Sequence, residues 1–98
     1  MTANLIVFYK APSDPEKFDK YYFETHIPLV QKIPGLAKVE VSRFTEENAP
    51  YHLMAALYFN SREERDAGLS SPEGQAAAAD LSNFATPDIV TRAFADVV

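Results

Sequence analysis

The residues best suited to chemistry lie on one predicted helix, in the stretch DKYYFETHIPLVQKIPG of residues 19–35. Tyr22 and His26 are four residues apart, so a helix places both side chains on one face. Pro28 has no N–H to donate to the carbonyl of Glu24, and we expect the helix to bend or loosen beside His26. A histidine that such a break exposes to a cavity could move a proton near neutral pH.

Plainer roles for the histidines stay open. His26 could instead hydrogen-bond a carbonyl at the helix end or simply pack there. His52 follows Pro50 and Tyr51 where a strand is expected to begin, which favours a position at the surface or rim. The two histidines lack the spacing of a metal-ligand pair, so no metal site is predicted. A site made of one histidine with carboxylates that the fold brings together is the weaker alternative.

Other routes to catalysis find little support in the residue types. The chain has no Cys and only three Gly, and it contains no GxSxG, GxGxxG or P-loop motif. Covalent catalysis therefore lacks an obvious nucleophile, and no cofactor is expected. Proton transfer assisted by His26 and Tyr22, with Glu40 as a further candidate, is the chemistry that these residues support.

Length and composition indicate one small domain over residues 1–98. The chain is 47% hydrophobic, so a dimer could bury apolar surface that a chain of 98 residues cannot, although a tightly packed monomer is the alternative. The net charge of -5 and the lack of a basic run argue against nucleic acid and anionic membranes as partners. The N-terminus predicts neither a signal peptide nor a membrane span, and we expect a soluble, cytoplasmic protein.

The elements that position these residues are predicted in the order β-α-β-β-α-β. Turn and capping residues place Asp14, Ser61 and Ser71 as helix N-caps, with Pro15 and Pro72 as first helical residues. The predicted strands are 5–9, 37–44, 51–59 and 89–98, and the predicted helices are 15–33, 62–68 and 72–83.

This order is that of an α+β, ferredoxin-like fold with a four-stranded antiparallel sheet and both helical regions on one face. The first and third strands are apolar on both sides, which leaves an apolar sheet face exposed in a monomer. We expect two subunits to pack these faces together as a homodimer, in a dimeric α/β barrel.

Two stretches resemble the EthD family of the dimeric α/β-barrel superfamily. In YYFETHIPLVQKIPGL the matching residues are Tyr21, Tyr22, His26, Pro28 and Pro34-Gly35. In LYFNSREERDAGLSSPEGQAAAADLSNF they are the Ser-Pro-Glu-Gly element of residues 71–74, with Asp80 and Phe84. Together the stretches extend the resemblance over nearly the whole chain.

The resemblance implies the fold and the homodimer more directly than a reaction. The family is named after a small protein of a bacterial ether-degradation pathway. Its superfamily includes lactone isomerases, polyketide cyclases, dehydratases and cofactor-free monooxygenases, several with an acid or base histidine on this helix. His26, with Tyr22, is therefore implied to be functional. Since Cys and Trp are absent, cysteine-dependent lactone isomerisation and haem degradation are disfavoured.

Three hypotheses follow. The first is a cofactor-independent catabolic or secondary-metabolic enzyme acting on a small apolar ring compound, whether aromatic, lactone or polyketide-like. The second is a dimer that binds such a compound without turnover, or an accessory protein of a degradation pathway. The third gives His26 a structural role alone. For the first, the predicted catalytic residues are His26 and Tyr22, and the predicted substrate-binding residues are Phe8, Glu40, Tyr51, Tyr58 and Phe84.

Overall fold

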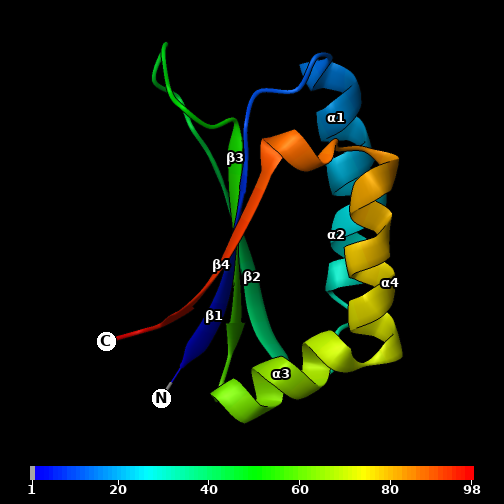
Figure 1. Ribbon diagram of the computed structural model, residues 1–98, viewed down its shortest axis with the longest axis vertical. Helices are drawn as coiled ribbons and strands as arrows, with labels where there is room; N and C mark the ends of the chain where they lie inside the picture. The colour runs from blue at the N-terminus through cyan, green and yellow to red at the C-terminus, as the bar shows by residue number, and fades with distance from the viewer. Residues whose placement is uncertain (1) are drawn as a thin grey trace.

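A four-stranded antiparallel sheet in the order β2-β3-β1-β4 forms one layer, and helices α1, α2 and α4 lie along one side of it (Figure 1). The computed structural model describes residues 2–98, so Met1 of the predicted domain lies outside the described residues. The predicted α+β, ferredoxin-like order is confirmed. The strands are β1 (Ala3–Tyr9), β2 (Leu36–Arg43), β3 (Leu53–Phe59) and β4 (Val90–Asp96). The helices are α1 (Pro15–Tyr21), η1 (Tyr22–His26), α2 (Ile27–Val30), α3 (Arg62–Ser70), α4 (Pro72–Asp80), η2 (Leu81–Asn83) and η3 (Pro87–Ile89).

The three predicted helix caps are confirmed. Asp14 accepts a hydrogen bond from the backbone N–H of Lys17 at 3.2 Å, and Ser71 Oγ accepts one from the N–H of Gly74 at 3.0 Å. Ser61 caps α3 in the same way. Because the backbone of Ser71 is extended, the chain changes direction between α3 and α4. As a result α3 crosses one end of the sheet, whereas α4 runs beside α1 and α2 (Figure 1).

The predicted loosening of the first helix occurs at residues 22–26. These residues form η1, a π-helical turn in which the N–H of Ile27 donates to the carbonyl of Tyr22. Pro28 removes one donor of the regular α-helical pattern. The π-helical turn, with its i→i+5 hydrogen bond, lies directly before this proline. The helix ends at Val30, three residues earlier than predicted, and Gly35 follows with a φ of 82° that glycine adopts without strain.

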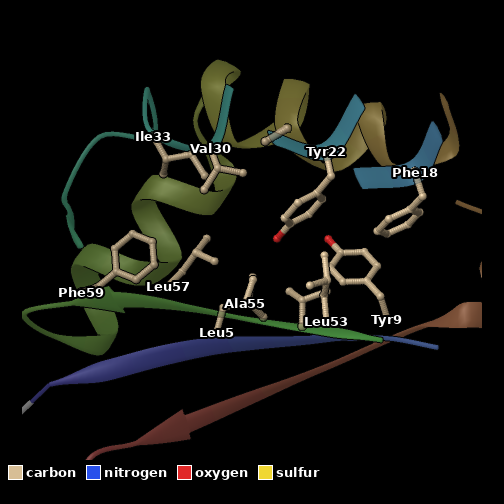
Figure 2. Close-up of a cluster of buried hydrophobic side chains, with 12 residues drawn as sticks. Leu5, Tyr9, Phe18, Tyr22, Val30, Ile33, Leu53, Ala55, Leu57 and Phe59 are labelled. Carbon is tan, nitrogen blue, oxygen red and sulfur yellow. The ribbon is translucent and has the colours of Figure 1, made fainter. Parts of the chain in front are cut away.

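The sheet divides its side chains between two different environments. Odd-numbered residues of β1 face the helices and pair with buried residues of β3, as Leu5 does with Leu57. Even-numbered residues of β1, including Phe8, point to the opposite face, which α1, α2 and α4 leave uncovered (Figure 1). The core between sheet and helices (Figure 2) consists of Leu5, Val7, Tyr9, Phe18, Tyr22, Val30, Ile33, Leu53, Ala55, Leu57, Phe59 and Ala77.

Gly68 of α3 packs so closely against the backbone at Pro34 that we expect any larger residue to destabilise the protein. A Cβ atom at this position would lie 2.4 Å from the carbonyl oxygen of Pro34 and 3.2 Å from the Phe59 ring. We expect Gly68→Ala to lower the free energy of unfolding by about 1–3 kcal/mol, measured by urea denaturation. Ser70→Ala, at an exposed position of the same helix, should change it by less than about 0.5 kcal/mol. An unchanged or increased stability of Gly68→Ala would contradict this packing, since alanine is otherwise the better helix former.

Candidate functional site

The centre of the candidate site is a buried pair formed by His26 and Asp80. His26 ends the π-helical turn η1, and Asp80 is the last residue of α4, so two separate helices bring the pair together. His26 Nδ1 lies 3.0 Å from Asp80 Oδ2, and the two residues are only 4% and 7% exposed. The hydrogen bond thus ties the first helical region to the second.

Two further donors hold the Asp80 carboxylate in place. The Tyr21 hydroxyl donates to Oδ1 at 2.6 Å, and Asn83 Nδ2 donates to the same oxygen at 3.0 Å. Burial alone would raise the pKa of Asp80, but the hydrogen bonds from Tyr21, Asn83 and His26 outweigh it and lower that pKa. Asp80 is therefore a carboxylate at neutral pH.

Burial lowers the pKa of His26 below its usual 6.5, an effect that the neighbouring Asp80 carboxylate opposes only in part. The imidazole is therefore neutral at pH 7. Because a carboxylate only accepts hydrogen bonds, the ring proton lies on Nδ1. Nε2 keeps its lone pair and is the nitrogen left for a ligand.

His26 lines a cavity of about 50 Å³ between the helices and the sheet. This volume holds a few water molecules but is smaller than the roughly 150 Å³ of a cavity known to bind benzene. A ring compound can enter only if the cavity opens toward its mouth. The lining is apolar except for four residues: His26, Tyr9, Tyr22 and Arg92 of β4.

Tyr9 and Tyr22 extend toward each other from the sheet and the helix, and their hydroxyl groups lie close together (Figure 2). Both rings are fully buried, and their centroids are 5.3 Å apart. Burial raises the pKa of each phenol far above its usual range. Both hydroxyls thus stay protonated and cannot serve as bases. Because they hydrogen-bond to each other, one of their two protons is left to donate to a ligand oxygen.

The structure brings together some of the predicted site residues and separates others. His26 and Tyr22 line the cavity, with ring centroids 5.5 Å apart. Phe84 packs against His26 at 4.7 Å between ring centroids but is not part of the lining.

The other four predicted substrate-binding residues belong to the uncovered side of the sheet. Phe8 packs on Tyr51 at 4.8 Å between ring centroids, and the Tyr58 hydroxyl donates to Glu40 at 3.3 Å. The register places Phe8, Glu40 and Tyr58 on the face opposite the helices. We therefore leave these four residues out of the candidate site.

His52 forms a second pair with a carboxylate, outside the cavity. Its Nε2 lies 2.7 Å from Asp19, which also pairs with Arg43 at 2.7 Å. Burial would raise the pKa of Asp19, but its bonds to His52 and Arg43 lower it. This cluster links α1 to the ends of β2 and β3, and it provides a natural control for His26.

Sequence reasoning missed the site roles of Asp80, Asn83 and Tyr9. Asp80 belongs to the family resemblance, but the amino-acid sequence does not indicate that it pairs with His26, which is 54 residues away. One local signal was present: Gly74, Ala77 and Asp80 recur every three residues and are the buried residues of α4. A carboxylate on the buried face of a helix needs a partner.

Two kinds of feature are absent from residues 2–98, a cluster of metal ligands and a membrane-spanning helix. No group of three or more His, Asp or Glu side chains in this range lies close enough together to hold a metal ion. No helix within it has both the length and the apolar character needed to cross a membrane.

Comparison with known proteins identifies close relatives. The model of the EthD domain family matches residues 10–88. An uncharacterised 11.0 kDa protein of Rhodococcus erythropolis, from the thcB–thcC intergenic region, is 41% identical over 93 residues, covering 92% of this chain and 89% of that protein. The crystal structure of an ethyl tert-butyl ether D (EthD) family protein from Bacillus halodurans has a TM-score of 0.94 and 32% identity, with 100% of both chains covered.

More distant solved structures share the fold. A dimeric ferredoxin-like protein from Thermobifida fusca has a TM-score of 0.75 at 13% identity, over 99% of this chain and 92% of that chain. SnoaB, a cofactor-independent oxygenase from Streptomyces nogalater, has a TM-score of 0.69 at 12% identity, over 98% of this chain and 92% of that chain. At these identities the similarity demonstrates the ferredoxin-like fold alone.

Proposed function

Because the chain belongs to the EthD family, we propose that it is a cytoplasmic, cofactor-independent enzyme that moves a proton on a small apolar ring compound. Its setting would be catabolic, as in ether degradation, or secondary metabolism. The observation that carries the proposal is the buried pair: Asp80 binds Nδ1 of a neutral His26, which lines an apolar cavity. The cofactor-independent oxygenase with the same fold supports it only by analogy.

The chemistry assigns a role to each group. Nε2 of His26 takes a proton from an acidic C–H or O–H of the ring compound, and the resulting imidazolium is stabilised by Asp80. Negative charge then develops on the substrate oxygen. The hydrogen-bonded pair of Tyr9 and Tyr22 hydroxyls can donate its free proton to that oxygen inside an apolar cavity, where such bonds are strong. Returning the proton to another carbon completes an isomerisation. If the carbanion first attacks a carbonyl carbon of the same molecule, the proton goes to the new alkoxide and completes a cyclisation. If the proton goes to a hydroxyl beside the carbanion, the C–O bond breaks and water leaves, which completes a dehydration.

The proposal is tested by a thermal-shift screen of phenols, lactones, aromatic acids and polyketide-like rings, followed by NMR of each bound compound in D₂O. A ligand raises stability by about 2.7 kcal/mol at a hundredfold excess over its Kd. Deuterium incorporation or product formation catalysed by the protein supports the enzyme. Binding of rings without exchange or product contradicts the enzyme and supports a non-catalytic binding or accessory protein.

The proposed enzyme is a homodimer joined through the uncovered face of the sheet. This face carries Ile6, Phe8 and Met54 on its two central strands. Among residues 2–98, the buried Asn4 Oδ1 on the same face has no hydrogen-bond partner. A second subunit would cover the apolar side chains and could supply a donor to Asn4. The dimeric structures with this fold are consistent with such an assembly.

Ile6→Glu is expected to convert the dimer into a monomer, because it puts a carboxylate at the centre of the proposed interface, where burial without a partner is costly. Sedimentation or light scattering should give half the wild-type mass. Ala79→Glu, at an exposed position of α4, adds the same charge and should remain dimeric. A wild-type protein that is monomeric at micromolar concentration, or an Ile6→Glu variant that stays dimeric, would rule out this interface.

A further inference from the structure

We propose that Arg92 binds an anionic oxygen group of the ligand, so that the ligand is a ring compound bearing a carboxylate. The inference rests on the proposed function and adds a substrate class to it. The ring would occupy the apolar cavity, with its reactive position against His26 and its carboxylate at the mouth.

Arg92 stands where the cavity meets the surface. It pairs with Val7 in the register of β1 and β4, which places it on the helix-facing side of the sheet. It lines the cavity that contains His26, and it also lines an adjoining hollow of about 80 Å³ with Leu5, Ala93 and Phe94. Leu5 and Arg92 are common to both spaces, so a ligand could extend from the cavity into the hollow.

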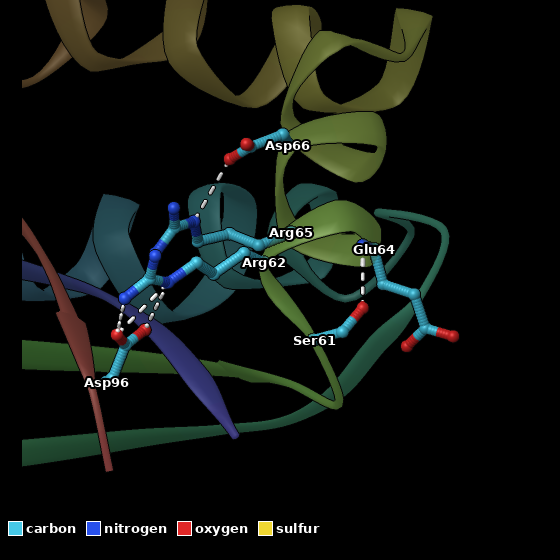
Figure 3. A network of polar contacts seen from close by, with 6 residues as sticks. All are labelled: Ser61, Arg62, Glu64, Arg65, Asp66 and Asp96. Atoms are coloured by element: carbon cyan, nitrogen blue, oxygen red, sulfur yellow. Dashed lines mark hydrogen bonds and ion pairs between the residues drawn. The ribbon is translucent and has the colours of Figure 1, made fainter. Parts of the chain in front are cut away.

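The other arginines near this mouth already have partners (Figure 3). Arg62 forms an ion pair with Asp96, and Arg65 pairs with Asp66 at 3.1 Å. Within residues 2–98, no carboxylate forms an ion pair with Arg92. An unpaired guanidinium at an apolar mouth is suited to a planar carboxylate, which it can bind through two parallel hydrogen bonds.

The surroundings of Arg92 also provide a surface for a ring. Phe94 is 57% exposed, and one face of its ring is covered by Arg65, whose guanidinium carbon lies 4.3 Å from the ring centroid. The net charge of the chain is -5, so the protein as a whole repels anions. Attraction of a carboxylate to this mouth must therefore come from local cations, and among the lysines and arginines of residues 2–98 Arg92 is the one that lines the cavity.

The test measures binding of matched probes by calorimetry at pH 7: benzoate, cyclohexanecarboxylate and 2-naphthoate, each against its neutral amide. We expect the wild type to prefer each carboxylate that binds by at least about tenfold, the effect of one charge-assisted hydrogen bond. Arg92→Gln should remove this preference, and Arg92→Lys should keep part of it. Lys32→Gln, at an exposed position outside the cavity lining, removes the same charge and should bind like the wild type.

Equal binding of acid and amide by the wild type, or a preference that survives Arg92→Gln, would overturn the role of Arg92 and leave the proposed function standing. A similar loss in Lys32→Gln would also overturn it, because the attraction would then reflect net charge. Failure of the wild type to bind any of the six probes would overturn the carboxylate inference alone. A His26→Gln variant that transfers the proton as fast as the wild type would instead overturn the proposed function.

Discussion

Replacing His26 with Gln is expected to slow proton transfer by about 10²–10⁴-fold, the usual contribution of a general base. Glutamine can still donate a hydrogen bond to Asp80, so the tie between the helices is kept while the basic nitrogen is lost. The rate is measured by NMR in D₂O as solvent deuterium replaces hydrogen beside the carbonyl of a ring ketone such as 2-tetralone. His52→Gln, which alters the histidine–carboxylate pair outside the cavity, should retain the wild-type rate.

The pH dependence of the proton-transfer rate tests whether His26 is the general base. A general base works in its neutral form, and burial lowers the pKa of His26 below 6.5. The wild-type rate should therefore stay constant as pH falls through 6.5 and decline only at lower pH. A rate that already halves above pH 6.5, or a His26→Gln variant as fast as the wild type, would exclude His26 as the base.

Stability offers a readout that needs no substrate. Below pH 6.5 the unfolded chain protonates His26 while the folded protein does not, so more protons bind to the unfolded state and stability falls as pH decreases. This contribution is absent in His26→Gln. As pH falls from about 7, the free energy of unfolding of the wild type should therefore decrease relative to that of His26→Gln.

Asp80→Asn is expected to lower the same proton-transfer rate by about 10²-fold or more, since the equivalent change in a serine-protease triad costs about 10⁴-fold. The amide cannot stabilise the imidazolium, and it allows His26 to carry its proton on either nitrogen. Loss of the carboxylate also removes a group that raises the pKa of His26, so the acidic limb of the rate profile should move to lower pH.

Nitrogen NMR distinguishes this role from a purely structural one. The wild type should show a single tautomer of His26 with the proton on Nδ1, and Asp80→Asn should show a mixture. Asn83→Ala removes one donor to Asp80 but leaves the carboxylate, and should lower the rate by about tenfold or less, the effect of one hydrogen bond. An Asp80→Asn variant with the wild-type rate and tautomer would show that the pair only joins two helices.

The face of β1 on which each aromatic side chain lies could not be predicted from the sequence. The run Leu5–Tyr9 is apolar throughout, so its pattern does not indicate which residues face the helices. A register shift of one residue exchanges the two faces of a strand. Phe8 was assigned to the ligand site, yet Tyr9 lines the cavity and Phe8 lies on the opposite face.

Features that depend on neighbouring residues along the chain could be predicted without the structure. Caps such as Asp14 and Ser71, and the loosened turn beside Pro28, follow from hydrogen bonds within a few residues along the chain. The order of strands and helices could be predicted from local patterns of the same kind, and this order in turn predicted the ferredoxin-like sheet. The contact of Asp80 with His26 and the position of Arg92 in the lining of their cavity could not be predicted in this way. These contacts join residues far apart in the chain, and they exist only because packing of helices on a sheet brings them together.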